Sequence, residues 1–288
     1  MSSQIVLMTG CSSGIGLATA KRLALVPNQR YIVIATVIAI SEKTDLVSAV
    51  GDALNKTIFI EELDVTKDND ITSVVDKTLK EYGRIDILIN VAGICFVEIP
   101  ERVPRDMIEK IFNVNVFGAM RLTQAVLSQM KKRKDGKIVT ITSLSGRIAM
   151  PYAEMYSSTK FALEGFFEVL AVGLRAFNIR ICVVEPGPVA TSLLHGLVKN
   201  FDAILDDESL NIIDRRHVQG FVDKSAIGEG QYNVMMADDV ANSIVTRCIE
   251  AEKPDLRHFL PEHLGEMVQT GIADLTGEKI VENGQSLI

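Results

Sequence analysis

Residues 5–16 read Ile5-Val6-Leu7-Met8-Thr9-Gly10-Cys11-Ser12-Ser13-Gly14-Ile15-Gly16, an apolar run that leads into a glycine-rich turn. The apolar residues predict a buried strand, and Gly10, Gly14 and Gly16 let the backbone turn tightly into a helix. The free N–H groups and the dipole at such a helix start attract a phosphate group. The beginning of the chain therefore predicts a strand, turn and helix that bind a nucleotide.

Short apolar runs rich in Val and Ile alternate with longer amphipathic stretches from this unit to about residue 190. This alternation is typical of successive strand–helix units around a parallel sheet that is buried on both faces. The expected strands are Ile5–Thr9, Tyr31–Thr36, Thr57–Leu63, Ile85–Asn90, Lys137–Thr142, Ile179–Glu185 and Leu256–Leu260. The expected helices span about 14–26, 68–82, 107–133, 152–178 and 238–252. The predicted fold class is α/β, a Rossmann-type doubly wound parallel sheet of about seven strands.

No Pro-, Gly- or Ser-rich linker divides the 288 residues, so we expect a single domain over residues 1–288. Residues 4–191 are expected to form the cofactor-binding and catalytic core, and 192–236 a lid over the substrate. Residues 237–275 would supply the last helix and strand region, and 276–288 a polar tail. The lid is predicted from apolar residues at helical spacing, for which packing on the core is the alternative: Leu193, Leu194, Leu197, Val198 and Phe201.

Composition argues against several kinds of partner. The formal charge of −7 disfavours nucleic acid and anionic membrane surfaces, because both reward clustered Lys and Arg. The four cysteines and four histidines show no metal-ligand spacing, so a reducing compartment and no metal are expected. Gly, Ser and Thr interrupt the uncharged residues 2–20, which predicts neither a signal peptide nor a membrane span. We expect a cytoplasmic protein, with peripheral membrane contact left open.

A second motif, Tyr156-Ser157-Ser158-Thr159-Lys160, falls in an expected helix thirteen residues after Ser143. Seen alone, the tyrosine would be a core aromatic and the lysine a solvated side chain. The i, i+4 spacing, however, puts both on one helix face, about 5–6 Å apart at Cβ. A phenol with a pKa near ~10 needs about 4 kcal/mol to work near neutrality, which one cation at ~4 Å supplies at an effective dielectric constant near 20. Together with the glycine turn, the motif predicts hydride transfer coupled to proton transfer.

Other strand ends are predicted to complete the cofactor site, since ligands of such sheets bind beyond the carboxyl ends of the strands. Asp64 can accept a hydrogen bond from an adenine amine, and the alternative is that it caps the following helix. Thr191 can bond a carboxamide. The predicted cofactor contacts are Gly10, Ser12, Ser13, Gly14, Ile15, Gly16, Asp64, Val65, Asn90, Ala92, Gly93, Tyr156, Lys160, Pro186, Gly187 and Thr191.

The stretch that distinguishes NAD from NADP is Thr36-Val37-Ile38-Ala39-Ile40, about twenty residues after the glycines. It contains neither the acid that binds a free 2′-hydroxyl nor the arginine that binds a 2′-phosphate. Because an acid would repel the phosphate, its absence permits NADP, and the hydroxyls of Ser12 and Ser13 could help to hold it. NADP is therefore favoured, and NAD remains open.

These residues resemble the short-chain dehydrogenase/reductase family over roughly residues 4 to 192. The matching features, in family order, are the glycine turn, Asn90-x-Ala92-Gly93, Asn115, Ser143, Tyr156-x-x-x-Lys160 and Pro186-Gly187. The runs Gly10-Cys11-Ser12-Ser13-Gly14-Ile15-Gly16-Leu17 and Lys160-Phe161-Ala162-Leu163-Glu164-Gly165 look most like the branch of 17β-hydroxysteroid dehydrogenase type 1 and photoreceptor-type retinol dehydrogenase.

The resemblance implies four catalytic residues. Tyr156 would be the general acid in carbonyl reduction and the base in alcohol oxidation. Lys160 would bind the nicotinamide ribose and lower the pKa of the tyrosine. Ser143 would polarise the substrate oxygen, and Asn115 would hold a water molecule of a proton relay, unless it only bonds its neighbours' backbone. The resemblance also implies a homodimer formed through the helices at 107–133 and 152–178.

Two positions depart from the family pattern. Val91 replaces an asparagine, which leaves in doubt a hydrogen bond that braces the sheet beside the cofactor. Ile38 stands where the resembling branch has an arginine that selects NADP. Cofactor affinity or choice is therefore expected to differ from that of the family.

Apolar loops beside the motif predict a lipophilic substrate: Ile94-Cys95-Phe96-Val97 and Ile148-Ala149-Met150-Pro151-Tyr152. The candidate substrate contacts are Ser143, Phe96, Met150, Tyr152, Leu194 and His217, with His195 as a further polar candidate. The resemblance alone implies a steroid, such as a 17β-hydroxysteroid, or a retinoid. The alternatives are a carbonyl or ketoacyl reductase of broad specificity and, from another class, a non-catalytic regulator that senses NAD(P).

Overall fold

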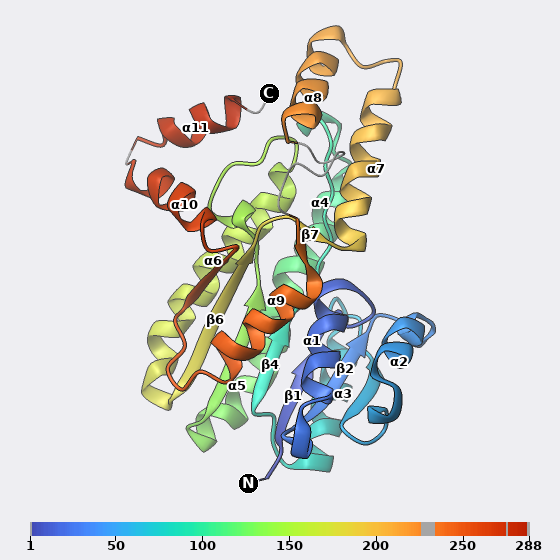
Figure 1. Cartoon of the computed structure of the whole chain (residues 1–288), viewed down its shortest axis with the longest axis vertical. Coiled ribbons are helices and arrows are strands. Elements are labelled where there is room, and N and C mark those ends of the chain that lie inside the picture. The colour runs from blue at the N-terminus through green and yellow to red at the C-terminus, as the bar shows by residue number, and fades with distance from the viewer. Residues whose placement is uncertain (1, 226–233, 275, 287–288) are drawn as a thin grey trace.

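Seven parallel strands form the centre of the protein, in the order β3-β2-β1-β4-β5-β6-β9 (Figure 1). The computed structural model describes residues 2–225, 234–274 and 276–286. The strands are β1 (Gln4–Met8), β2 (Tyr31–Val37), β3 (Ile58–Glu62), β4 (Ile87–Asn90), β5 (Gly136–Ile141), β6 (Ile179–Pro186) and β9 (Arg257–Leu260). All seven strands fall where the sequence predicted them, with ends that differ by one or two residues. The strand order reverses between β1 and β4, where doubly wound sheets bind their ligands.

One face of the sheet is covered by α1 (Gly14–Ala24), α2 (Thr44–Val50), α9 (Ala237–Ser243) and η8 (Ile244–Ile249), a π-helical continuation of α9. Their buried apolar side chains form one core cluster with those of the strands. Helix α2 was not predicted. It has seven residues, too few for a helical period to appear in the sequence.

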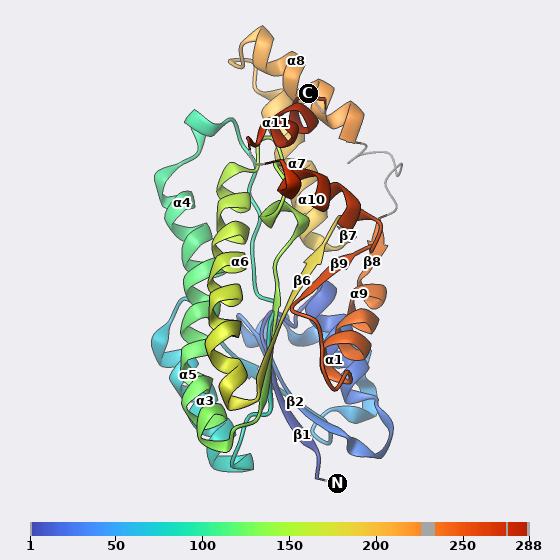
Figure 2. The same ribbon diagram turned by 90° about the vertical axis from the view of Figure 1, so that its left-hand side faces the viewer.

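The other face is covered by α3 (Asp68–Tyr82), α5 (Ala119–Arg133) and α6 (Glu154–Leu174), which form the second core cluster with the sheet. Figure 2 shows these helices on one side of the strands and α1 and α9 on the other. The sheet is therefore buried on both faces, which explains its Val- and Ile-rich strands.

The helix predicted over 107–133 is interrupted. It consists of α4 (Arg105–Phe112), the π-helical turn η5 (Asn113–Gly118) and α5. A Cβ atom on Gly118 would lie 2.7 Å from Cγ2 of Val65, so the wide turn packs closely against the loop after β3. Such π-turns often occur at functional sites, and this one contains Asn115.

Helices α7 (Ser192–Asp206) and α8 (Ile212–Ser225) stand beyond the carboxyl edge of the sheet, within the predicted lid segment (Figure 1). Short strands β7 (Val189–Ala190) and β8 (Met235–Met236) pair at its ends. Residues 226–233 of the predicted lid lie outside the described residues. Helices α10 (Leu264–Ala273) and α11 (Glu278–Gln285) lie at the same end of the molecule. None of the described helices is long and apolar enough to cross a membrane.

Candidate active site

The glycine turn lies at the carboxyl end of β1 and leads into α1. Gly10 and Gly14 have φ angles of +68° and +54°, in the left-handed region that favours glycine. A Cβ atom on Gly16 would lie 2.0 Å from the carbonyl oxygen of Gly10, so no side chain fits there. Ser13, the N-cap of α1, makes no side-chain cap bond. The first N–H groups of α1 therefore remain open to a phosphate, and the turn fits the pyrophosphate of a dinucleotide.

Thr9 supplies the brace that Val91 left in doubt. Its Oγ1 accepts hydrogen bonds from the backbone N–H groups of Val91 and Ala92, both at 3.1 Å. The Cys11 N–H donates to the carbonyl oxygen of Thr36 at 2.9 Å. The ends of β1, β2 and β4 are thus tied together without an asparagine side chain at position 91.

Two predicted cofactor residues have their polar groups engaged by the protein. The Asn90 amide donates to Oγ1 of Thr123 at 3.2 Å and of Thr140 at 3.3 Å, and its Oδ1 is buried without a partner in the described structure. The Asp64 carboxylate accepts from the N–H of Thr66 at 2.9 Å and from its hydroxyl at 2.7 Å. Burial opposes ionisation of Asp64, but Thr66 and Lys67 outweigh it and lower the pKa of the carboxyl. The Asp64 side chain thus closes a turn before α3, but it does not cap that helix, whose N-cap is Lys67.

Tyr156 and Lys160 lie one turn apart on α6, and both are buried. The Lys160 Nζ lies over the tyrosine ring, 5.4 Å from its centroid, as the i, i+4 spacing predicts. The same Nζ donates to the carbonyl oxygen of Ile141, at the end of β5, at 3.2 Å. The end of the strand therefore fixes the ammonium beside the phenol.

Burial acts on both groups of this pair. It raises the pKa of Tyr156 above its ordinary value, and a hydrogen bond with Ser143 lowers that pKa only in part. It lowers the pKa of Lys160 to about 8, against the opposing effects of Cys95 and Glu164. The lowered tyrosine pKa expected from Lys160 is not found, because burial of the phenol and the neighbouring Cys95 outweigh the hydrogen bond with Ser143.

Asn115 joins the loop after β4 to the catalytic helix. Its Oδ1 accepts from the N–H of Ile94 at 2.8 Å, and its amide donates to the Ile94 carbonyl at 2.9 Å and to Oγ1 of Thr159 at 3.0 Å. The Thr159 hydroxyl in turn donates to the carbonyl oxygen of Tyr156 at 2.6 Å. Asn115 thus holds the position of α6 through Thr159, a partner that the sequence did not single out.

Small residues keep space open around this pair. A Cβ atom on Gly93 would lie 3.4 Å from Oδ1 of Asn115 and 3.8 Å from Nζ of Lys160. Ser143 lies two residues after β5 and caps the short helix Leu144–Gly146, with its Oγ accepting from the Ser145 N–H at 3.1 Å. Ser143, Tyr156 and Lys160 therefore converge at the carboxyl edge of the sheet.

The connection after β6 lies against the glycine turn. A Cβ atom on Gly14 would lie 2.9 Å from Cγ2 of Thr191, and the hydroxyls of Ser13 and Ser192 are 3.2 Å apart. The Gly187 N–H donates to the carbonyl oxygen of Leu260 in β9 at 2.7 Å. Most of the predicted cofactor contacts are thereby gathered at one edge of the sheet. Ile15 lies in the same glycine turn, with its side chain partly buried against the core.

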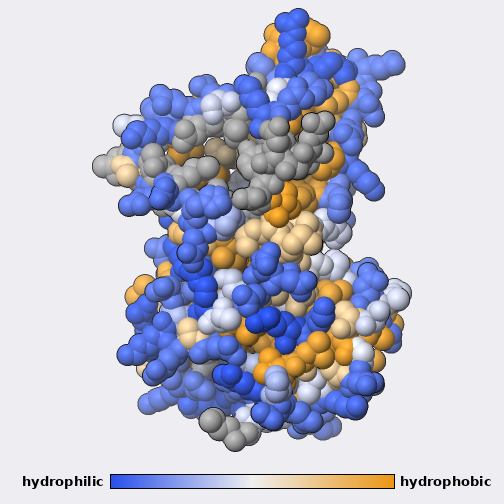
Figure 3. Space-filling view, in the orientation of Figure 1, coloured by the Kyte–Doolittle hydropathy of each residue, from blue (hydrophilic) through white to orange (hydrophobic). Residues whose placement is uncertain are grey.

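An apolar cluster above Tyr156 joins the predicted substrate loops to α7 and α8. Its buried members are Val97, Ile99, Ile111, Ala153, Tyr156, Leu197, Phe201, Ile204, Leu210, Val218 and Phe221. Phe96, Met150 and Tyr152 pack against it. The Tyr152 ring meets those of Phe201 and Phe221 edge-on, with centroids 6.1 and 5.7 Å away. Figure 3 shows apolar surface beside the lower end of α7.

The remaining predicted contacts are not members of this cluster. Leu194 is half-buried, and the side chains of His195 and His217 are exposed. Cys95, by contrast, lies beside Tyr156 and Lys160. The sequence had indicated only that it belongs to an apolar loop. Burial raises the pKa of its thiol to about 12, against the opposing charge of Lys160. The thiol therefore stays protonated at neutral pH.

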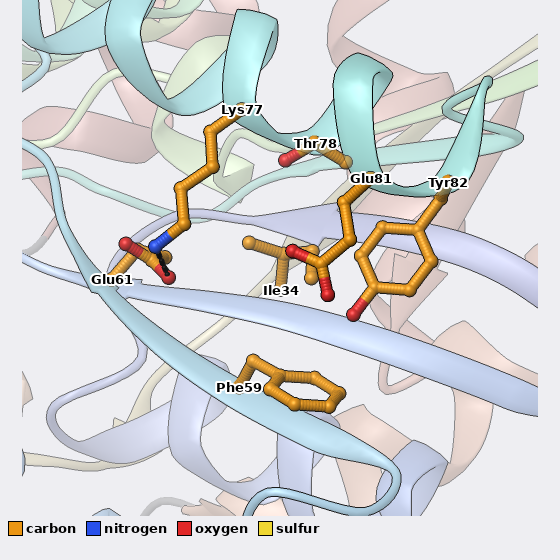
Figure 4. A pocket seen from close by; sticks show the side chains of 7 residues that line it. All are labelled: Ile34, Phe59, Glu61, Lys77, Thr78, Glu81 and Tyr82. Atoms are coloured by element: carbon orange, nitrogen blue, oxygen red, sulfur yellow. Dashed lines mark hydrogen bonds and ion pairs between the residues drawn. The ribbon is translucent and has the colours of Figure 1, made fainter.

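A small cavity of about 100 Å³ lies away from this site, between α3 and the strands β2 and β3 (Figure 4). Its lining residues are Ile34, Phe59, Glu61, Lys77, Thr78, Glu81 and Tyr82. The Lys77 ammonium and the Glu61 carboxylate form an ion pair across it at 2.5 Å. The cavity is too small for a dinucleotide or a steroid-sized ligand.

The short chain dehydrogenase family matches residues 4–201 of the chain. Retinol dehydrogenase 8 of Bos taurus is 34% identical over 287 residues, which cover 98% of this chain and 89% of that protein. The 17-beta-hydroxysteroid dehydrogenase type 1 of Homo sapiens is 31% identical over 283 residues, covering 98% and 84%. A solved short-chain dehydrogenase from Streptomyces avermitilis superposes with a TM-score of 0.78 at 30% identity, covering 98% and 99%. ElxO with NADP bound superposes with a TM-score of 0.73 at 25% identity, covering 90% and 97%.

Proposed function

The chain belongs to the short-chain dehydrogenase family, and from this premise we propose that it interconverts a hydroxyl and a carbonyl group on a retinoid or a 17β-hydroxysteroid, with NADP as the preferred cofactor. That it is an oxidoreductase of alcohol and ketone groups follows from the family and from its dehydrogenase relatives. The observation that carries the choice of substrate is the apolar cluster that surrounds Tyr156 beneath α7 and α8.

The residues present fit a nicotinamide dinucleotide. The open N-terminus of α1 would hold the pyrophosphate, and Lys160 the nicotinamide ribose, beside the space that Gly93 leaves free. When bound, the cofactor supplies the hydride for reduction and, in its oxidised form, a positive charge that favours the phenolate.

In carbonyl reduction, the Ser143 hydroxyl donates to the substrate oxygen and the Tyr156 hydroxyl delivers the proton to it. The raised pKa of Tyr156 means that this proton is in place throughout the neutral range. Lys160 beside the ring stabilises the phenolate that remains. Asn115 and Thr159 hold the helix that carries both residues.

The lid suits a long apolar substrate. Phe201 of α7 and Phe221 of α8 are buried against Tyr152, so the region where α7 and α8 pack beside the catalytic residues is aromatic and dry. Phe96 and Met150 extend the same surface toward the catalytic serine and tyrosine. A ring system or polyene would bury apolar area there that a small polar carbonyl could not.

The preference for NADP is supported by the end of β2. The Ile38 side chain is 56% exposed there, and no acid lies in residues 36–40. Glu62 of β3 lies beside this stretch and accepts from the N–H of Ile40 at 2.9 Å. A relative of the same fold has been solved with NADP bound.

Purified protein supplied with each cofactor and with all-trans retinal, retinol, estrogens and androgens tests the proposal by the change in absorbance of the nicotinamide. We expect turnover of at least one of these lipids, with a higher kcat/KM for NADP(H) than for NAD(H). Ile38→Arg should increase that preference, because arginine can pair with the 2′-phosphate. Activity confined to small polar carbonyls would contradict the substrate proposal, and a preference for NAD(H) the cofactor proposal.

A further inference from the structure

Two cysteines and a histidine with no part in the active site meet in the protein core. Cys182 lies in β6, Cys248 in η8 and His258 in β9. One ligand atom from each, the two Sγ atoms and an imidazole nitrogen, lie within 4.8 Å of one another. Cys182 and Cys248 are fully buried and His258 is 2% exposed.

Strand pleating explains why these side chains converge. Cys182 and Val184 point to the same face of β6, since alternate residues of a strand share a face. His258 pairs with Val184 across the β6–β9 ladder. Cys182, Val184 and Cys248 belong to the core cluster on the face that α9 and η8 cover. Figure 2 shows β9 beside β6 with α9 next to them.

The histidine offers a free lone pair at this point. Its Nε2 lies 3.0 Å from the carbonyl oxygen of Asp255. A carbonyl only accepts, so Nε2 carries the proton and Nδ1 is left as an acceptor. That Nδ1 is buried without a hydrogen-bond partner in the described structure. Metal-binding histidines show this arrangement, in which the second ring nitrogen donates to a backbone carbonyl and fixes the tautomer.

We propose that Cys182, Cys248 and His258 form a zinc site, with two thiolates and the Nδ1 atom as ligands. Zn–S bonds of about 2.3 Å in a tetrahedron place two sulfur atoms about 3.8 Å apart, and Zn–N bonds are shorter. The ligand atoms of this cluster lie within 4.8 Å of one another, so small side-chain movements would bring them to the distances of a zinc site. The described residues supply three ligands, and no fourth is assigned among them. Soft thiolates with one imidazole favour zinc over calcium or magnesium.

The charges around the cluster are compatible with this ion. Lys137 donates to the carbonyl oxygens of Ala251, at 2.7 Å, and Ile249, and its charge acts on both cysteines. Zn²⁺ with two thiolates and a neutral imidazole carries no net charge, so the filled site would not repel this ammonium.

The ion would have a structural role. It would link the edge strand β9 and the π-helical η8 to β6. No disulfide joins these three elements, since Cys182 and Cys248 are free. The carbonyl oxygen of Leu260 in β9 receives the Gly187 N–H of the cofactor-site loop, at 2.7 Å. Zinc should therefore stabilise the fold and this edge of the site without taking part in hydride transfer.

Metal analysis of the full chain tests the site independently of any enzyme activity. Protein expressed with added zinc, kept reduced and dialysed against a weak chelator, should retain about one zinc per chain. Cys182→Ser, Cys248→Ser and His258→Gln should each lose most of it. Cys95→Ser and His263→Gln, which alter a thiol and an imidazole elsewhere, should keep it.

Cobalt substitution gives a second measurement that does not depend on the variants folding. Wild-type protein loaded with Co²⁺ should show the intense thiolate-to-cobalt charge-transfer absorption of cysteine ligation, and its thermal midpoint should rise with the metal. Wild-type protein that holds only traces of zinc and shows no such band would overturn the proposal. A Cys182–Cys248 disulfide in the reduced preparation, or zinc retained by Cys248→Ser, would overturn it as well.

Discussion

The Nζ atom of Lys160 lies 5.4 Å from the centre of the Tyr156 ring, and burial displaces the pKa of both groups toward their neutral forms. The phenol therefore keeps its proton near neutral pH and releases it less readily than an ordinary tyrosine, so proton transfer needs further positive charge beside the phenolate.

Replacing Tyr156 with Phe removes the proposed proton donor and leaves the ring in place. We expect kcat for retinal or steroid reduction to fall by about 10²–10⁴-fold, while the Kd for the cofactor stays within about two-fold. Tyr82→Phe is the matched control, because Tyr82 also has a raised pKa but lies at the remote cavity. Full activity in Tyr156→Phe would reject the assigned donor.

Lys160 is predicted to reduce the stability of the fold. Its pKa is lowered from 10.5 to about 8, so the unfolded chain holds that proton more tightly than the folded protein does. The free energy of unfolding should then increase with pH between about 8 and 10.5. Below about pH 8, burial of the charged ammonium should lower it by the full amount, about 3 kcal/mol.

Lys160→Met keeps the length of the side chain and removes the charge. At pH 7 this variant should be more stable than wild type by about 1–3 kcal/mol, less the lost bond to Ile141, and the advantage should fade above about pH 10. Urea unfolding at several pH values measures this. If Lys160→Met is less stable than wild type by the same amount at every pH, burial does not disfavour the charged form of Lys160.

Thr9→Val tests the brace at the reversal point of the sheet. Valine has the same shape, but it leaves the N–H groups of Val91 and Ala92 without their acceptor. We expect a loss of about 1–3 kcal/mol in unfolding free energy, together with weaker cofactor binding. Thr9→Ser keeps the hydroxyl and should behave like wild type. If the two variants lose stability equally, the hydroxyl is not the brace.

The sequence revealed the parts of the fold whose signal is local. Periodic apolar runs gave the seven strands, and the glycine turn and the Tyr156–Lys160 spacing gave the catalytic edge of the sheet. Helix α2 was missed because seven residues show no period, and the π-turn at Asn113–Gly118 because its residues keep the pattern of an ordinary helix.

Contacts between distant segments could not be predicted in the same way. The sequence indicated only that Thr9 precedes the turn. In the structure its hydroxyl accepts the hydrogen bonds that brace the sheet, a role expected of a side chain at position 91. Cys182, Cys248 and His258 have no ligand spacing along the chain and meet only because β6, η8 and β9 pack together. The pKa of Tyr156 was expected to fall because its burial was unknown.

The outer face of α6 should join two copies of the chain. Phe161, Gly165, Val169 and Val172 recur at helical spacing, and the valines are 75% and 78% exposed, which is unusual for apolar residues at the centre of a helix. Phe117 of the neighbouring turn η5 is also exposed, at 49%. A second copy packed on this face would bury these side chains, and Gly165 would let the two helices approach closely.

Light scattering after size-exclusion chromatography measures the oligomeric state. One chain has a mass of 31.6 kDa. Wild-type protein should elute with twice that mass, and Val169→Glu combined with Val172→Glu should elute as a monomer, because like charges would face each other in a dry interface. Leu25→Glu, which places the same charge on a 52% exposed residue after α1, should remain a dimer. A monomeric wild type, or a double variant that still pairs, would show that α6 is not the contact.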